Sequence, residues 1–203
     1  MGQTHSNPTT FLLVRHAETI WNHEHRHAGS MEVPLSHDAE RQIARLTKKL
    51  VHKPIKAIYS SPLTRCQITI HPVAEIYDLK VIIRPDIMER DLGKWEQKTL
   101  EELLPTHPGY EFPKSAYTGD YHIPEAETLE DMEHRVRKFL HEAHEAHPGQ
   151  HIVAATHSGV IWMIVNRIVT NPPSDFQWPS NCSICTITTE GNHYLFESFD
   201  IGK

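Results

Sequence analysis

The feature that most constrains the fold of this chain is the alternation of short buried segments with amphipathic ones. Residues 10–14 form a run of apolar and β-branched side chains, which is typical of a buried strand. Apolar residues at helical spacing then lead up to Leu50, and Ser36 has the side chain of an N-cap at their start. Strands that alternate with helices build a mainly parallel sheet with helices on both faces. The pattern therefore predicts an α/β fold, a three-layer αβα sandwich.

The same alternation continues to the end of the sequence. Further strands are predicted at 57–60, 81–83, 152–155, 183–188 and 194–198, and helices from 63, at 99–104, 128–147 and 160–169. Ser61 and Pro62 have the chemistry of a helix start, and Pro72 is expected to kink or divide the helix that they open. Residues 92–124 lack periodicity, so we expect an excursion, or lid, over the active site. One domain over residues 1–203, with a disordered leader over 1–9, accounts for the chain.

Charge and hydropathy exclude several classes of protein. The 203 residues carry 20 Lys and Arg against 26 Asp and Glu, a formal net charge of −6, without a basic block. Nucleic-acid binding is disfavoured, because it needs a basic face that displaces counterions. No apolar run approaches the roughly 20 residues of a membrane span, and the start lacks a signal peptide's apolar core. We expect a cytoplasmic protein. The start also fits the loose myristoylation pattern at Gly2, although an unmodified leader explains it equally.

The signals for metal and redox sites are weak. The three cysteines are too few for a disulfide framework, which fits a reducing compartment. Cys182 and Cys185 have the spacing of a redox or zinc pair but no second pair. We interpret them as one core and one surface cysteine, on opposite faces of a strand. His23, His25 and His27 alternate through a predicted loop, and we interpret them as exposed side chains rather than metal ligands.

Five polar residues follow predicted strands or open the helix after one. They are Arg15, His16, Arg65, Glu89 and His157. Because the carboxyl ends of parallel strands meet at one edge of a sheet, we expect these side chains to converge. Two arginines and two histidines form a positive pocket suited to a phosphate dianion, although a sulfate or carboxylate would use the same donors. A protonated glutamate beside them is suited to a leaving alkoxide, which favours phosphoryl transfer.

Residues 13–22 read Leu-Val-Arg-His-Ala-Glu-Thr-Ile-Trp-Asn. This run resembles the signature of the histidine phosphatase, or phosphoglycerate mutase-like, superfamily, which usually reads Arg-His-Gly-Glu-Thr followed by Trp-Asn. Further similar blocks, in the family's order, are Arg26, Gly29, 33–36, 59–65, Glu89 with 92–96, 127–129 and 156–160. The resemblance spans roughly residues 10 to 190 and implies a phosphoglycerate mutase-like fold.

The resemblance also implies a role for each candidate residue. His16 would be the nucleophile that forms a phosphohistidine, while Arg15, Arg65 and His157 hold the phosphoryl oxygens. Glu89 would donate a proton to the leaving oxygen and later take one from water. The family needs neither a metal nor another cofactor. Further candidate ligands of the phosphate or substrate are Asn22, Ser158 and Arg90, of which Arg90 is open between a substrate contact and a salt bridge.

Four positions depart from the family's usual pattern. Ala17 replaces a glycine beside the nucleophile, where we expect the extra methyl group to be tolerated. Ala28 stands where glutamine is common, which removes a substrate contact. Gln97 and Ser158 replace glycines, so loops at the pocket would be stiffer or more crowded. These departures affect specificity more than chemistry.

Four functions remain open at this point. The leading one is a metal-independent phosphatase that hydrolyses phosphomonoesters through a phosphohistidine, since mutases of the family are typically longer. Phosphoglycerate mutase-type transfer is an alternative, and a module that binds a phosphorylated ligand without turnover is another. The histidine content also permits a metal carrier. The residues do not determine which small phosphorylated metabolite is the substrate, nor the oligomeric state, for which a homodimer is one option.

Overall fold

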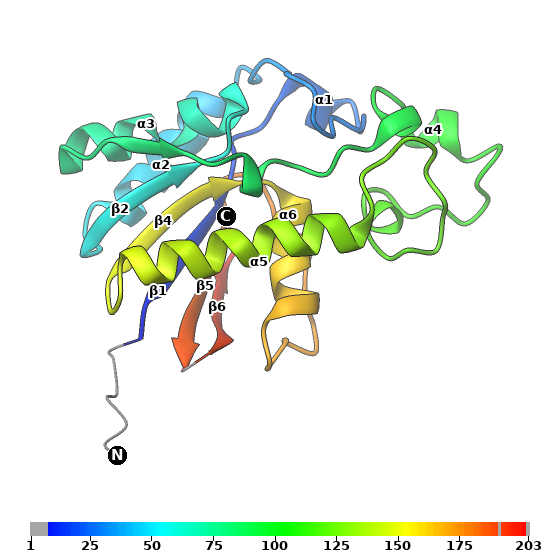
Figure 1. The fold of residues 1–203 in the computed structure, drawn as a ribbon. Helices are drawn as coiled ribbons and strands as arrows, with labels where there is room; N and C mark the ends of the chain where they lie inside the picture. Colours follow the sequence, from blue (N-terminus) through cyan, green and yellow to red (C-terminus); the bar gives the residue numbers. More distant parts are fainter. Residues whose placement is uncertain (1–7, 191, 202–203) are drawn as a thin grey trace.

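The computed structural model describes residues 8–190 and 192–201, which fold around one six-stranded sheet (Figure 1). The strands are β1 (Thr10–Arg15), β2 (Ile55–Ser60), β3 (Val81–Ile83), β4 (His151–Thr156), β5 (Ile184–Glu190) and β6 (His193–Asp200). Their order in the sheet is β3-β2-β4-β1-β5-β6. The first four in this order run parallel, and β5 and β6 are antiparallel to their neighbours. The predicted mainly parallel sheet is confirmed.

Side chains of β1 alternate between two hydrophobic cores, one on each face of the sheet. Phe11 and Leu13 pack with α5 (Leu129–Ala146) and α6 (Ser158–Met163). Leu12 and Val14 pack with α2 (Ala39–Leu50) and α3 (Thr64–Tyr77). All four side chains are at most 3% exposed, so apolar residues fill both faces of the strand. The three-layer sandwich is thereby confirmed (Figure 1).

Helix boundaries differ from the predicted ones at three places. Helix α2 begins at Ala39 rather than after Ser36, because the Ser36 hydroxyl donates instead to the Glu18 carboxylate over 2.8 Å. Ser61 is not the N-cap of α3, since that position belongs to Leu63. Helix α6 begins at Ser158, two residues early, and continues as a π-helix at 164–168.

Pro72 does not divide α3, which runs through it from Thr64 to Tyr77. The pyrrolidine ring removes a single i→i−4 hydrogen bond. Buried side chains on both sides of Pro72, among them Ile70 and Val73, anchor the helix to the core and hold its path. Tertiary packing therefore outweighs the local preference of proline.

The excursion at 92–124 is largely irregular and lies beyond the start of α5 (Figure 1, green). Its regular parts are two 3₁₀ turns at Gly93–Trp95 and Lys114–Ala116 and the short helix α4 (Leu100–Leu103). Helix α4 begins with a capping box at Thr99, and the short helix predicted at 99–104 is confirmed. Trp95, Tyr110 and Tyr121 form an aromatic cluster, with Trp95 and Tyr110 perpendicular at 5.1 Å between ring centroids. Aromatic packing, rather than hydrogen bonds between strands, therefore stabilises this segment.

Three expectations about single residues are wrong. Cys182 and Cys185 belong to the cores on opposite faces of the sheet, as expected, but both are buried. Cys182 precedes β5 with a φ of 56°, so the strand alternation does not reach it. His27 is 3% exposed, because its ring packs against the excursion. Thr9, assigned to the leader, is buried and bonded to Thr189; residues 1–7 lie outside the described part of the chain.

Two properties of the described residues bear on function. Within 8–190 and 192–201, no helix has the length and apolar character needed to cross a membrane. The same residues contain no group of three or more His, Cys, Asp or Glu side chains that could hold a metal ion. The alternating histidines illustrate this, since His27 turns into the core while His23 and His25 are exposed.

Candidate active site

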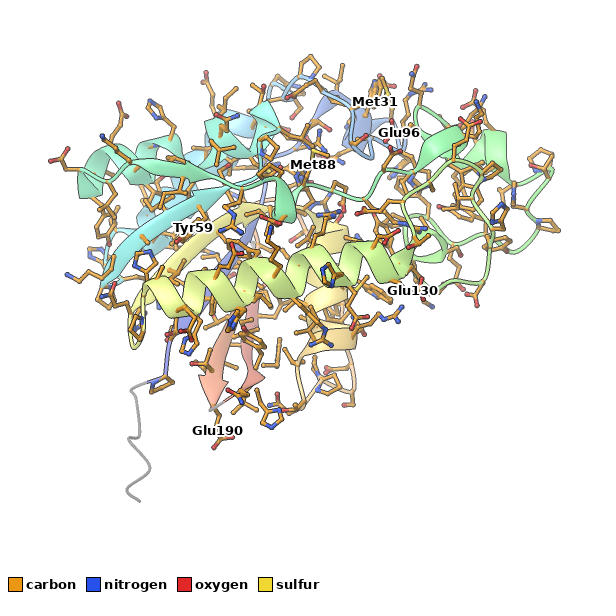
Figure 2. All side chains as sticks on the ribbon, viewed as in Figure 1. Met31, Tyr59, Met88, Glu96, Glu130 and Glu190 are labelled. Atoms are coloured by element: carbon orange, nitrogen blue, oxygen red, sulfur yellow. The ribbon has the colours of Figure 1, made fainter. Side chains whose placement is uncertain are left out.

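The carboxyl ends of the parallel strands and the excursion enclose a cavity of about 50 Å³. This volume corresponds to roughly three to five water molecules, enough for a phosphoryl group. Its lining comprises Arg15, His16, Asn22, Arg26, His27, Ala28, Gly29, Arg65, Glu89, Leu92, Phe112, Pro113, Tyr117 and Ser158. Met88, labelled in Figure 2, marks the segment that leads from β3 into the cavity wall at Glu89. Six of the residues predicted from strand positions and resemblance therefore line one cavity.

His16 follows the end of β1 with its ring fixed by the next peptide group. Nδ1 lies 2.7 Å from the carbonyl oxygen of Ala17. A carbonyl only accepts, so Nδ1 carries the proton and Nε2 keeps its lone pair. Burial, with Arg65 and Arg15 nearby, holds the pKa of His16 well below its usual value. The imidazole is thus neutral, with a free nitrogen available as a nucleophile.

Arg15 and Arg65 supply the positive charge of the cavity. Arg15 donates from Nη1 to the carbonyl of Pro179, and Arg65 donates to the carbonyls of Met31 (2.6 Å) and Gly29 (2.9 Å). The Nε atoms of both arginines are buried without a hydrogen-bond partner among the described residues. Burial lowers the pKa of Arg15 to about 10, which leaves it charged at neutral pH. Two guanidinium groups in the lining of one cavity indicate a site for an anion.

The loop that orients Arg65 is itself held by the excursion. Glu96, labelled with Met31 in Figure 2, accepts hydrogen bonds from the backbone N–H (2.7 Å) and the hydroxyl (2.9 Å) of Ser30. Gly29 has a φ of +50°, and a Cβ there would lie 2.1 Å from the Glu96 carboxylate. Glycine is therefore required at position 29, and the carbonyls of residues 29 and 31 are fixed towards the guanidinium of Arg65.

Glu89 is a buried carboxyl on the opposite wall. Its oxygens accept from the backbone N–H groups of Arg90 and Gly159, both over 3.0 Å. Burial raises the pKa of Glu89, although these two hydrogen bonds and Arg65 oppose the rise. Gly159 permits this contact, since a Cβ would lie 2.4 Å from Glu89 and 2.1 Å from the Tyr117 ring. A carboxyl of raised pKa facing two arginines can act as an acid and then as a base.

His157 lies behind His16, with 5.2 Å between ring centroids, and is fully buried. Its Nε2 lies 2.8 Å from the hydroxyl of Ser61 and 3.4 Å from the thiol of Cys66. Burial, followed by Arg65 and His16, holds the pKa of His157 well below its usual value. Both histidines are therefore neutral here, and only the arginines make the pocket positive. This corrects the expectation that all four side chains contribute charge.

The other predicted ligands occupy different places. Asn22 accepts on Oδ1 from the Thr19 backbone and from Asn181, over 3.1 Å each, which leaves its Nδ2 donor for a ligand. Ser158 lines the cavity at the start of α6. Arg90 does not line it: its guanidinium donates to the carbonyls of Ala116 and Glu127 and so ties the excursion to the Glu89 segment. Arg90 forms no ion pair among those recorded for the described residues.

Several residues of the site were missed from the sequence. Tyr117, buried against Glu89, lies in the irregular excursion, where no periodicity marks it. Arg135 of α5 binds Glu127 over 2.6 and 2.8 Å and the Met88 carbonyl over 2.7 Å, and so supports the Glu89 segment. The available signal for Arg135 was its partner Glu127, which lies in one of the blocks that resemble the family. Gln97 has a φ of 69°, which explains why a glycine is usual there.

Comparison with known proteins agrees with this geometry. The sequence matches the histidine phosphatase superfamily (branch 1) over residues 11–201. It is 33% identical to phosphoserine phosphatase 1 of Hydrogenobacter thermophilus over 150 residues, which are 72% of this chain and 70% of that protein. It is 29% identical over 160 residues to a probable phosphoglycerate mutase of Cronobacter sakazakii, covering 79% of this chain and 74% of the relative.

A solved structure shows the same fold. The mycobacterial glucosyl-3-phosphoglycerate phosphatase superposes with a TM-score of 0.83 at 20% identity, covering 94% of this chain and 98% of that one. The fold thus agrees with the sequence match. The chain belongs to the histidine phosphatase superfamily.

Proposed function

We propose that this protein hydrolyses phosphomonoesters through a phosphohistidine on His16. The observation that carries the proposal is the neutral His16 ring, whose Nδ1 is committed to a carbonyl and whose Nε2 is free. It lies in a cavity that is also lined by the side chains of Arg15 and Arg65. A phosphoryl group there would be neutralised by the two guanidinium groups and would meet the lone pair.

In the first step, Nε2 of His16 attacks phosphorus, and a P–N bond forms as the P–O bond to the leaving alcohol breaks. Arg15 and Arg65 neutralise the phosphoryl oxygens, and Asn22 donates from Nδ2. Glu89 in its protonated form, which burial favours by raising its pKa, gives its proton to the leaving oxygen. His157 is fully buried and does not line the cavity, so its contact with the phosphoryl oxygens stays a prediction from the family resemblance.

In the second step, water attacks the phosphoryl group and the P–N bond breaks. Glu89, now a carboxylate, takes the proton from this water, and His16 returns to its neutral form. The reaction requires no further group beyond substrate and water. The substrate class is a small phosphorylated metabolite, and three free cysteines fit a protein of the cytoplasm.

Release of phosphate from an aryl phosphomonoester in the presence of EDTA tests this proposal. An aryl ester has a good leaving group, so the assay reports on the nucleophile more than on the substrate pocket. We expect turnover that survives chelation and is lost in His16→Ala, while His23→Ala, an exposed histidine outside the cavity, retains it. Equal activity of His16→Ala and the parent would contradict the proposal, and transfer to an added alcohol instead of water would favour a mutase.

A further inference from the structure

The part of the cavity lining that the excursion contributes differs in character from the arginine and histidine side chains. Four of its lining residues are apolar or aromatic: Leu92, Phe112, Pro113 and Tyr117. All four come from the excursion. Because the cavity holds little more than a phosphoryl group, the alcohol part of a substrate must lie against these side chains or displace them. The chemistry of this wall therefore decides which alcohols are accepted.

Besides Arg15, Arg65 and Glu89, the cavity lining contains the charged side chain of Arg26, whose charge is already balanced. Arg26 donates from Nε to Glu24 over 3.0 Å and from Nη1 to the Gln97 carbonyl. The Glu102 carboxylate lies 3.8 Å from the same Nη1. A carboxylate on the substrate would thus meet one cation and two competing carboxylates. It would gain little attraction there.

His27 adds no charge to the wall. Its Nε2 is hydrogen-bonded to the Tyr110 hydroxyl, and its ring centroid lies 4.5 Å from that of Phe112. Burial lowers the pKa of His27 to about 4, so the ring is neutral at physiological pH. Ala28 stands beside it, where a longer polar side chain would reach into the cavity. The wall offers apolar contact and aromatic faces but no free cation.

We infer that the preferred substrates are phosphomonoesters of uncharged alcohols with an apolar or aromatic face, and that esters with a carboxylate near the phosphate are disfavoured. This inference rests on the proposed function. Its physical reason is that a carboxylate buried against Leu92, Phe112 and Tyr117 loses its hydration without gaining an unpaired cation. The inference separates this protein from a relative named phosphoserine phosphatase.

The test compares kcat/KM for hexyl phosphate, phosphoserine and 3-phosphoglycerate, which are all esters of primary alcohols. We expect hexyl phosphate to exceed both acids by about ten-fold or more, the usual range for apolar pocket contacts. An equal or higher value for either acid overturns the inference. Failure on all three, while an aryl ester is hydrolysed, also overturns it. Failure on the aryl ester as well contradicts the proposed function itself, and the inference with it.

Variants locate the preference in the wall. Phe112→Ala is expected to lower kcat/KM for hexyl phosphate several-fold more than it lowers the value for 3-phosphoglycerate. Phe176→Ala, at a half-buried phenylalanine outside the cavity, serves as the matched control. Phe112→Arg adds a free cation and should raise the value for 3-phosphoglycerate while lowering that for hexyl phosphate. Equal effects of Phe112→Ala on both substrates would overturn the assignment of this wall.

Discussion

The two halves of the cavity are built in different ways. His16, which follows β1, and Arg65, in the first turn of α3, are held by hydrogen bonds to backbone carbonyls. The excursion instead places Phe112 and Tyr117 by aromatic packing, in a segment with one four-residue helix and two short 3₁₀ turns. Hydrogen bonds with fixed direction suit the attacking and neutralising groups, whereas a packed apolar wall suits recognition of an alcohol.

The two halves of the cavity also differ in how they tolerate amino-acid substitutions. A hydrogen-bonded group at a strand end leaves an unsatisfied partner when it is replaced. An aromatic wall leaves only a cavity, which a neighbouring side chain or a larger substrate can fill. We therefore expect variants of the first half to act on catalysis and variants of the second on specificity and on stability at low pH.

Replacement of Arg65 by lysine is expected to have the largest effect. The lysine amine cannot reproduce the fork that bonds Gly29 and Met31 while keeping a donor for the ligand. We expect kcat/KM for any phosphomonoester to fall on the order of 10²- to 10³-fold, as for loss of one charge-stabilising donor. Arg45→Lys, on the exposed face of α2, is the control. If Arg65→Lys keeps an activity close to the parent's, the guanidinium of Arg65 is not needed for catalysis.

Gly159→Ala is expected to reduce kcat by about 10²-fold, the usual cost of displacing a reacting group by about 1 Å. The added methyl group would displace the Glu89 carboxyl and the Tyr117 ring. Because Arg15 and Arg65 are untouched, inhibition by inorganic phosphate should stay close to the parent's. Steady-state kinetics with phosphate as inhibitor measures both quantities. A loss of phosphate binding as large as the loss of kcat would show that the wall at Glu89 also holds the anion.

The variant His27→Gln tests whether the excursion keeps His27 buried, and the readout is the unfolding free energy. Its expected effect is the smallest of the three. His27 has a depressed pKa, so the stability that it contributes is present above its unfolded value of 6.5 and is lost as the pH falls towards about 4. Between pH 7 and pH 5 the loss covers about 1.5 units, or about 2 kcal/mol at about 1.4 kcal/mol per unit.

Chemical denaturation at the two pH values measures this loss. The parent should lose about 2 kcal/mol more of its unfolding free energy than His27→Gln does. The matched control is His71→Gln, an exposed histidine on α3, which should behave as the parent. The same pH dependence in all three proteins would mean that the excursion opens to solvent around His27.

The sequence predicted the catalytic half of the cavity well and the excursion poorly, for a physical reason. Periodicity locates strands, and the carboxyl ends of parallel strands bring Arg15, His16 and Glu89 together whatever the intervening loops do. The fold therefore followed from the positions of apolar residues, and the site from the polar residues that end each strand.

The residues that were missed depend on contacts far apart in the sequence. Tyr117 reaches Glu89 from an irregular segment, and the burial of His27 depends on Tyr110 and Phe112. The alternation of histidines at 23, 25 and 27 predicted exposure, but a bridge between Arg26 and Thr99 brings that loop against the excursion. Such placements are decided by tertiary packing, which local patterns do not encode.

The nucleophile is tested most directly by rapid-quench trapping of the phosphoenzyme in the parent and in Glu89→Gln. The substrate is an aryl phosphomonoester, because its leaving group departs without a proton from Glu89. We expect an acid-labile phosphoryl group on Nε2 of His16, formed before phosphate release. It should accumulate in Glu89→Gln, which lacks the base for the attacking water. Phosphate release without any phosphohistidine, or a phosphoryl group on another residue, would contradict the central claim that His16 is the nucleophile.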